Sequence, residues 1–258
     1  MKIATWNVNS LRVRMPHLLN WLKQAQPDLV GLQETKIEDE GFPRLEIEEA
    51  GYRVVFSGQR TYNGVAILSR LEDEAQEVVC DLPGITDVQR RVLCATYGDV
   101  RFLNLYVPNG QALGSDKYAY KLQWLNALAE YIRNQLQQHP KLVVVGDFNI
   151  APDERDVYDP AAWQDSVLFS QPERDAFHHL LELGLVDTFR LFDQEEKSFS
   201  WWDYRAAAFR RNLGLRIDHI LASPAMAKAC KSSNVDKEPR RWERPSDHAP
   251  VIAEFTLG

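Results

Sequence analysis

Hydrophobic positions in the first half of the chain alternate between strand-like runs and helical spacing. Residues 2–8 predict a strand, and residues 12–25 predict a helix because Leu18, Leu19 and Leu22 recur at helical intervals. Several further strand-like runs lie close together with Gly or Asn between them, which favours antiparallel neighbours. A short apolar run at residues 28–33 has the length of a strand. The further strands are expected at residues 52–57, 64–69, 75–80, 90–97 and 100–107.

The second half contains one strongly amphipathic segment, at residues 116–138. Its spacing predicts a long helix with one face on the core. That face carries Trp124, Leu125, Leu128, Ile132 and Leu136. Residues 142–146 (Leu-Val-Val-Val-Gly) have the composition of a buried central strand, and a long polar connection follows them. The remaining expected elements are a helix near 173–183 and strands at 217–222 and 250–256.

No linker rich in Gly or Ser divides the chain, and no repeat or low-complexity segment is visible. We therefore expect one α/β domain over residues 1–258. The mixture of hairpin-like strands and single helices argues against a doubly wound parallel sheet. Two packed sheets with helices outside fit the pattern better.

Composition is that of a globular protein, with 45% hydrophobic and 26% charged residues. The three cysteines form no CxxC and no zinc-type spacing, which indicates a reducing cytosol. No signal peptide and no membrane-spanning apolar stretch is visible. We therefore expect a cytoplasmic protein that has no membrane partner. Nothing indicates more than a monomer. The net charge of −7 counts against a nucleic-acid partner for the molecule as a whole.

Polar residues recur just past the apolar strands, and each alone has an ordinary structural explanation. Asp147 after Gly146 is typical of a strand-ending turn, and Tyr106 of a core aromatic with its hydroxyl at the rim. Together, however, the oxygen-bearing side chains form a coherent set without cysteine, which is what Mg²⁺, or alternatively Mn²⁺, requires. The candidate metal ligands are Asn7, Glu34, Asp147, Asn149 and Asp247.

Five motifs stand at the ends of the expected strands. They are Trp6-Asn7-Val8-Asn9, Leu32-Gln33-Glu34-Thr35, Tyr106-Val107-Pro108-Asn109, Gly146-Asp147-Phe148-Asn149 and Ser246-Asp247-His248-Ala249-Pro250. These motifs resemble those of the exonuclease III family of apurinic/apyrimidinic (AP) endonucleases, within the endonuclease/exonuclease/phosphatase superfamily, and the match runs in the expected order from residue 2 to about 255. The resemblance implies a four-layered α/β sandwich, two packed mixed β-sheets flanked by helices, with the active site at the rim of the sheets.

Roles for the metal-binding side follow from the same resemblance. Glu34 matches the main metal ligand, with Asn7 and Asp247 nearby. Asp147 matches the residue that aligns or deprotonates the attacking water. The family often has an aspartate where Asn9 stands, which puts a metal contribution from this position in doubt.

The phosphate side is implied in the same way. Tyr106 is expected to contact the phosphate, Asn109 to fix that loop, and Asn149 to bind the nucleophile or a phosphate oxygen. His248, held by Asp218, matches the pair that binds the scissile phosphate. The number of metals and the choice between Asp147 and His248 as formal base stay open.

An uneven charge distribution is compatible with DNA binding by an acidic protein. Residues 201–245 hold ten Lys or Arg against five Asp or Glu, an excess of +5 that leaves −12 on the rest. A local basic face of this kind suits a phosphate backbone, although a solvated, salt-bridged surface is an equally good explanation of a single cluster.

By resemblance, Trp201, Leu215 and Ile217 line a pocket for a flipped-out abasic sugar. Arg205 and the loop after Asn109 are candidates for contact with the duplex backbone. The loops at 152–172 and 205–215 should decide whether an internal abasic nucleotide enters. Two bulky residues in the first loop, Leu168 and Phe169, would obstruct it and favour DNA ends.

The expected activity is hydrolysis of double-stranded DNA 5′ to abasic sites, removal of blocking groups or nucleotides from damaged 3′ ends, or both. A competing hypothesis is a different enzyme of the superfamily, such as a phosphoinositide phosphatase, a sphingomyelinase or a DNase I-like nuclease. Those families tend to have a histidine motif where this chain has Tyr106. Two further hypotheses are a non-catalytic nucleic-acid-binding relative and a purely structural domain, and the second leaves the clustered carboxylates unexplained.

Overall fold

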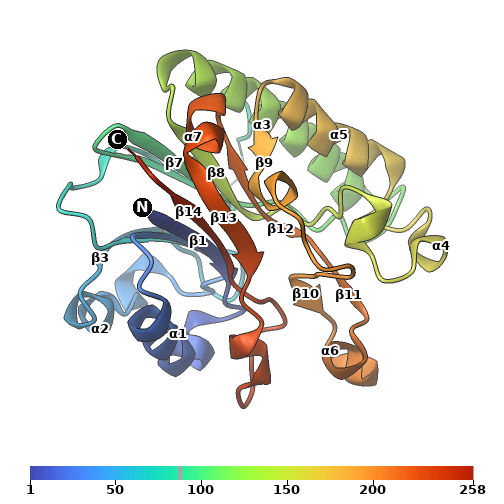
Figure 1. Cartoon of the computed structure of the whole chain (residues 1–258), viewed down its shortest axis with the longest axis horizontal. Helices are drawn as coiled ribbons and strands as arrows, with labels where there is room; N and C mark the ends of the chain where they lie inside the picture. Colours follow the sequence, from blue (N-terminus) through green and yellow to red (C-terminus); the bar gives the residue numbers. More distant parts are fainter. Residues whose placement is uncertain (87–88, 258) are drawn as a thin grey trace.

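The computed structural model describes residues 1–86 and 89–257, and its core is two six-stranded sheets (Figure 1). In spatial order, the first sheet contains β13 (Cys230–Val235), β14 (Val251–Phe255), β1 (Lys2–Asn7), β2 (Leu29–Gln33), β4 (Val65–Ser69) and β3 (Arg53–Ser57). The second contains β5 (Gln76–Val79), β6 (Val92–Tyr97), β7 (Val100–Tyr106), β8 (Leu142–Asp147), β12 (Asp218–Ala222) and β9 (Val186–Asp187). A small two-stranded sheet pairs β10 (Trp201–Trp202) with β11 (Gly214–Leu215).

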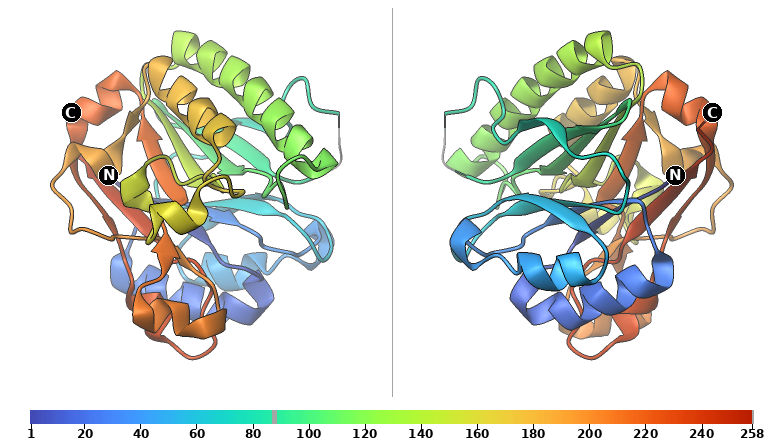
Figure 2. Two further views of the ribbon diagram at one scale, coloured as in Figure 1. Left: turned by 90° about the vertical axis from the view of Figure 1, so that its right-hand side faces the viewer. Right: turned by 90° about the vertical axis from the view of Figure 1, so that its left-hand side faces the viewer.

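Helices cover the outer faces of both large sheets, as the two side views of Figure 2 make clear. The helices α1 (Leu11–Ala25) and α2 (Arg44–Glu49) pack on the first sheet, and α3 (Asp116–Gln138) and α5 (Gln171–Glu182) on the second. The other helices are α4 (Pro160–Trp163), α6 (Ala208–Arg211) and α7 (Pro224–Ala229). Short 3₁₀ turns are η1 (Asp39–Gly41), η2 (Glu154–Asp156), η3 (Thr188–Leu191), η4 (Arg205–Ala207) and η5 (Glu238–Arg241). The expected four-layered sandwich of two mixed sheets is confirmed.

The strand β8 illustrates why central strands are mainly apolar on both faces. Its residues alternate between two buried faces, because Val143 and Val145 pack between the sheets while Leu142 and Val144 pack against α3 and α5. A strand buried on both faces has no polar side to show in its sequence. In the described part of the chain, no helix is long and apolar enough to cross a membrane.

The expected long elements are all present, within one or two residues at most ends. The strand β13 was missed because it lies at a sheet edge and its sequence, Cys-Lys-Ser-Ser-Asn-Val, is mostly polar. Short elements such as β9, β10, β11 and α7 were also missed. They are too short to establish a period.

The topology brings the polar strand ends together. Two strand pairs, β1–β2 and β7–β8, are parallel, so their carboxyl ends reach the same edge of each sheet. In β7–β8 the register sets Tyr106 beside Asp147. The antiparallel neighbour β12 begins with Asp218, which lies opposite Asp147. Residues more than a hundred positions apart therefore meet at one rim.

Gly146 allows β8 to deliver Asp147 to this rim. Its φ of 151° is one that side-chain-bearing residues rarely adopt, and an added Cβ would lie 2.0 Å from the carbonyl oxygen of Leu105. We expect Gly146→Ala to lower the free energy of unfolding by about 3 kcal/mol or more, because the clash is with backbone. Urea denaturation followed by circular dichroism measures this.

Gly184→Ala is the matched control. Gly184 also has a positive φ, 114°, but nothing lies within 4 Å of the added Cβ, so backbone strain alone should cost roughly 1–2 kcal/mol. Equal losses in the two variants would show that close approach at Gly146 is unimportant.

Candidate active site

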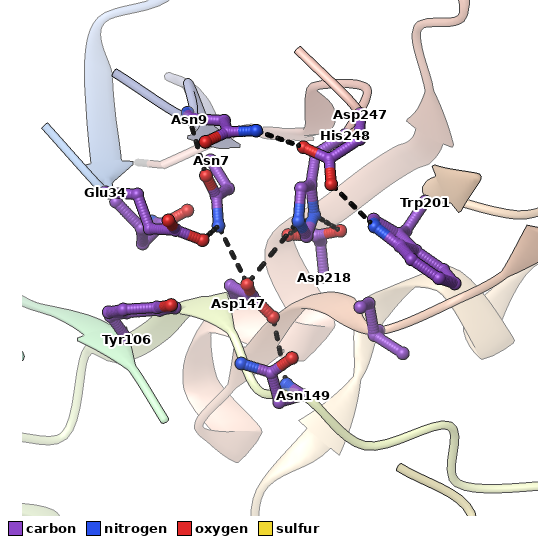
Figure 3. A network of polar contacts seen from close by, with 12 residues as sticks. Asn7, Asn9, Glu34, Tyr106, Asp147, Asn149, Trp201, Asp218, Asp247 and His248 are labelled. Carbon is purple, nitrogen blue, oxygen red and sulfur yellow. Dashed lines mark hydrogen bonds and ion pairs between the residues drawn. The ribbon is translucent and has the colours of Figure 1, made fainter. Parts of the chain in front are cut away.

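Three potential metal-binding side chains converge at the rim of the sheets (Figure 3). One ligand atom from each of Glu34, Asp147 and His248 lies within 4.8 Å of the others. Glu34 follows β2 directly and adopts a left-handed φ of 49°, which turns its side chain out of the strand direction. A non-glycine residue in this conformation is unusual and marks a position that the surrounding fold constrains.

Asn7 joins the two carboxylates of this cluster. Its Nδ2 donates hydrogen bonds to Glu34 Oε1 at 2.9 Å and to Asp147 Oδ2 at 2.8 Å. Its Oδ1 accepts from the backbone N–H of Asn9 at 3.0 Å, which fixes the orientation of the amide. Asn7 is fully buried, so the bridge between Glu34 and Asp147 is preorganised.

Asp147 is a buried carboxylate at the end of β8. Burial raises its pKa to about 7, with a further contribution from the neighbouring Asp218 carboxylate. His248 and the Asn7 hydrogen bond act in the opposite direction and favour the charged form. The second oxygen, Oδ1, accepts from the backbone N–H of Asn149 at 2.9 Å. An acid with a pKa near neutrality is suited to proton transfer.

His248 is buried and paired with Asp218. Its Nδ1 lies 2.8 Å from Asp218 Oδ2, and its Nε2 lies 3.7 Å from Asp147 Oδ2. Burial alone would lower the pKa of His248, but the surrounding carboxylates, of which Asp218 is the strongest, outweigh it and raise the pKa to about 10. The imidazole is therefore a cation at neutral pH.

Asp247 lies outside this cluster, and neighbouring donors occupy both of its oxygens. Oδ1 accepts from Asn9 Nδ2 at 3.0 Å, and Oδ2 accepts from Trp201 Nε1 at 2.9 Å (Figure 3). Asn9 also accepts from Lys36 Nζ at 2.7 Å, and Lys36 lies 3.2 Å from Glu34 Oε2. A lysine thus supplies positive charge beside the position where the family often has an aspartate.

Tyr106 closes another side of the site. The guanidinium of Arg91 lies over its ring, 4.8 Å from the centroid. Burial raises the pKa of Tyr106 well above its usual value, and the Glu34 and Asp147 carboxylates raise it further. The phenol therefore stays protonated and can donate a hydrogen bond to an anionic ligand.

The amide side chains of Asn109 and Asn149 also meet. Asn109 Nδ2 lies 3.4 Å from Asn149 Oδ1, while Asn149 Nδ2 donates to the carbonyl of Val107 at 2.9 Å. Asn109 is exposed and Asn149 is buried, so the first faces solvent at the mouth of the site and the second lies beneath it.

The residues expected to line a sugar pocket form a closed apolar cluster. Leu215 and Ile217 are no more than 1% exposed, and they pack with Leu168 and Phe169, while the half-buried Trp201 packs against the outside. Leu168 has a positive φ of 80° that is costly for leucine. The two bulky residues of the 152–172 loop therefore fill the space over Leu215 and Ile217.

Not all basic residues of the C-terminal third lie on the surface beside the site. Arg216 is buried between the carboxylates of Asp156 and Asp187, and Arg240 is buried among aromatic rings. Lys228 lies on α7, after the far end of β12 from the site. Only some of the basic residues in the C-terminal third therefore form a charged surface beside the site. A count of charges along the sequence cannot show this, because it takes no account of burial or position.

Arg205 remains an exposed candidate for contact with a polyanion. Its guanidinium is paired with Asp203 at 2.7 Å, and its side chain is 89% exposed. The pair competes with a phosphate only weakly, because exposed ion pairs contribute little free energy.

Several residues of the site had no role in the sequence analysis. Ser200 Oγ donates to Asp218 Oδ2 at 2.7 Å and accepts from the backbone N–H groups of Ile217 and Asp218, so it orients the partner of His248. Lys36 follows Glu34 by two residues, and that proximity was the only signal available for it. No short-range pattern points to Ser200.

The donor set fits a divalent cation. Glu34 and Asp147 supply hard carboxylate oxygens a few ångströms apart, and burying both charges near Asp218 would be unfavourable without compensating positive charge. Asn7 and Asn149 face the Asp147 carboxylate with N–H groups, so the oxygen donors of the cluster are the carboxylates of Glu34 and Asp147. The described residues of the cluster can therefore hold a metal ion.

Comparison with known proteins agrees with this geometry. Residues 4–248 match the endonuclease/exonuclease/phosphatase family. The chain is 34% identical to exodeoxyribonuclease III of Haemophilus influenzae, over 99% of this chain and all of that protein. Among solved structures, it is similar to a 3′ phosphatase from Neisseria, NExo, bound to a product DNA hairpin, at 51% identity with a TM-score of 0.97. It is also similar to an AP endonuclease from Archaeoglobus fulgidus, at 40% identity with a TM-score of 0.96, and both comparisons cover all of each chain.

These matches extend over the whole fold and include every strand end that contributes to the site. The chain therefore belongs to the endonuclease/exonuclease/phosphatase family and, within it, to the exonuclease III group of metal-dependent phosphodiester hydrolases.

Proposed function

We propose that this protein is a Mg²⁺-dependent DNA repair hydrolase that acts chiefly on blocked 3′ ends of double-stranded DNA. The convergence of Glu34, Asp147 and the Asp218-paired His248 carries the proposal of phosphoester hydrolysis. The filled apolar cluster carries the preference for ends. The similar Neisseria protein is described as a 3′ phosphatase bound to DNA, which supports both parts.

In this proposal, Glu34 and Asp147 bind the cation. Asn7 and Asn149 hold the Asp147 carboxylate through N–H groups, and Asn7 becomes a ligand only if its amide turns. A bound Mg²⁺ would neutralise charge on the phosphoryl oxygens. Asp247 belongs to the candidate ligands only if it gives up its hydrogen bond with Asn9 or Trp201. Otherwise it acts by holding those two residues.

Asp147 is the better candidate for the base that receives a proton from water. His248 is already protonated at neutral pH, so Asp147 is the member of the pair that remains able to accept a proton. A cationic His248 instead donates a hydrogen bond to the scissile phosphate and stabilises the charge that develops on it. Asn149 supports the position of Asp147 through its backbone N–H.

Tyr106 and Asn109 act on the substrate side. The protonated phenol of Tyr106 donates to a phosphate oxygen, with Arg91 stacked behind it. Asn109 is exposed at the mouth of the site, next to Asn149, and contacts the strand that enters. Arg205 is free to exchange its partner Asp203 for a backbone phosphate.

Selection for 3′ ends rests on Leu168. An internal abasic nucleotide must leave the helix and enter a pocket, and here Leu168 and Phe169 occupy the space above Leu215 and Ile217. A terminal 3′ phosphate reaches the carboxylates without entering that pocket. The strained backbone of Leu168 persists because Glu173 Oε1 accepts from its N–H at 3.0 Å and Ala151 N–H donates to its carbonyl at 2.8 Å.

The first prediction concerns metal and chemistry. The wild-type protein should remove a 3′ phosphate from a DNA hairpin with Mg²⁺ and not with EDTA. Asp147→Ala and His248→Ala should each lower kcat by roughly 10²–10⁴-fold while largely retaining DNA affinity. Exposed Asp193→Ala and His178→Ala are the matched controls. Wild-type rates in the site variants, or hydrolysis of a lipid phosphate in place of DNA, would overturn the proposal.

The second prediction concerns pH. In Asp218→Asn, His248 loses the carboxylate that most strongly raises its pKa, so burial should lower the pKa into or below the neutral range. Because the protonated form is required, kcat/KM of the variant should fall as pH rises above about 7, whereas wild-type kcat/KM should not fall up to pH 8.5, since His248 stays protonated and ionisation of Asp147 can only raise it. The exposed Asp175→Asn is the control. A kcat/KM of Asp218→Asn that stays level or rises between pH 7 and 8.5 would contradict the requirement for a protonated His248.

The third prediction concerns lesion choice. Leu168→Gly removes the side chain and relieves the positive φ, so incision at an internal tetrahydrofuran site should increase at least about tenfold, or 1.4 kcal/mol in the barrier. Removal of a 3′ phosphate should change little. Val167→Ala, one residue away, is the control for general loosening of the loop. Unchanged incision by Leu168→Gly would mean that this residue does not restrict the pocket.

A further inference from the structure

A lysine and a glutamate, both completely buried, lie beneath the active-site loops. Lys121 on α3 and Glu173 on α5 have 0% exposed side chains and form an ion pair. The other two hydrogen bonds of the ammonium group go to backbone carbonyls, of Asn149 at 2.7 Å and Asn109 at 3.1 Å. All three N–H donors of Lys121 are therefore used.

The two carbonyls belong to different active-site loops. Asn109 follows β7, three residues after Tyr106, and Asn149 follows β8, two residues after Asp147. The ammonium group thus joins the substrate-side loop to the loop that carries the proposed base. Gly110 packs closely on the same lysine, since an added Cβ would lie 3.1 Å from Lys121 Cδ.

Glu173 extends the connection to a third loop. Besides Lys121, its Oε1 accepts from the backbone N–H of Leu168 at 3.0 Å. Its Oε2 accepts from the backbone N–H and hydroxyl of Ser170, at 3.0 and 2.6 Å, and so caps α5. The hydroxyl of Tyr118 on α3 lies 2.7 Å from Ser170 Oγ. Three loops around one site therefore meet at a single buried ion pair.

Stability alone does not account for a charged pair in this position. Removing both ions from water costs several kcal/mol each, and buried ion pairs can often be replaced by apolar groups without loss of stability. An apolar replacement, however, offers no donor to the carbonyls of Asn109 and Asn149. What the pair provides uniquely is a fixed distance between these two backbone segments.

We propose that Lys121, held by Glu173, is a positioning residue that sets the separation of the Asn109 and Asn149 loops for catalysis. The inference rests on the proposed function, because its test measures removal of a 3′ phosphate. It acts through backbone positions, since Lys121 contacts neither Glu34 nor the imidazole of His248 among the hydrogen bonds and ion pairs of the described residues.

The test uses Lys121→Met/Glu173→Gln in the full chain. This pair removes both buried charges, and the glutamine oxygen still caps Ser170, but the backbone N–H of Leu168 and the carbonyls of Asn109 and Asn149 lose their partners. We expect a lower melting temperature, so kcat is measured per folded molecule at a temperature at which the variant is folded. On the 3′-phosphate hairpin, kcat should fall about 10- to 100-fold with KM changed less than about threefold, because the reacting groups are misaligned.

Arg101→Met is the matched control. Arg101 is also a buried cation between β7 and α3, bonded to Gln135, but it lies at the opposite end of β7 from Tyr106, about 17 Å away. This variant should lose stability while kcat per folded molecule stays at the wild-type value.

The outcomes separate the two proposals. If the wild-type protein does not remove the 3′ phosphate, the proposed function fails. If the wild type is active and the folded Lys121→Met/Glu173→Gln variant has wild-type kcat, or if Arg101→Met lowers kcat equally, the positioning role is overturned. Lys121→Met alone leaves Glu173 buried without its partner and should lose both stability and kcat. Wild-type kcat in the folded fraction of this variant would also contradict the role.

Discussion

The cost of burying the Asp147 carboxylate is the constraint on which the rest of the site depends. A carboxylate in the interior must be neutralised, hydrogen-bonded or paired with a cation. Here Asn7, the Asn149 backbone and the cationic His248 share that task, and each comes from a different strand end. The strand order of both sheets can be understood as the arrangement that brings these partners to one place.

The same principle extends to the contact between the sheets. Gln33 and Asn104 are buried polar residues in the apolar layer, and Gln33 Nε2 donates to Asn104 Oδ1 at 2.7 Å. Asn104 in turn donates to the carbonyls of Leu32 and Ala66 in the first sheet. Apolar packing alone tolerates small shifts, whereas such hydrogen bonds fix the register of the two rims. Polar groups thus define the geometry of a core that hydrophobic residues stabilise.

The sequence was sufficient for the long elements and for the residues that meet at the rim. Glu34, Asp147 and His248 could be predicted because each directly follows or precedes an apolar run and belongs to a motif with a characteristic order. The contacts of Lys121 could not be predicted. Its position on the buried face of an amphipathic helix gives no indication of which carbonyls lie above it, since those belong to loops whose path depends on the whole fold.

Other differences have similar physical origins. The basic excess in residues 201–245 was real, but a linear count does not distinguish Arg216, which is buried, from Arg205, which is exposed. The hydrogen bonds of Asp247 with Asn9 and Trp201 could not be predicted either, because the direction of a side chain at a loop is not encoded in spacing. The position of a polar residue at the end of a strand therefore predicted that it lies near the site, but not which residues it contacts there.

The position of β14 has a consequence for the newly synthesised protein. This strand lies between β13 and β1, and His248 comes just before it. The strand β1 pairs with β2 on one edge, but its other edge stays unpaired until β14 is made. Every fragment that ends before residue 248 lacks the imidazole, and the Asp218 carboxylate in such a fragment has no cation to balance it. During translation, the imidazole of the site and the strand that completes the first sheet therefore arrive together.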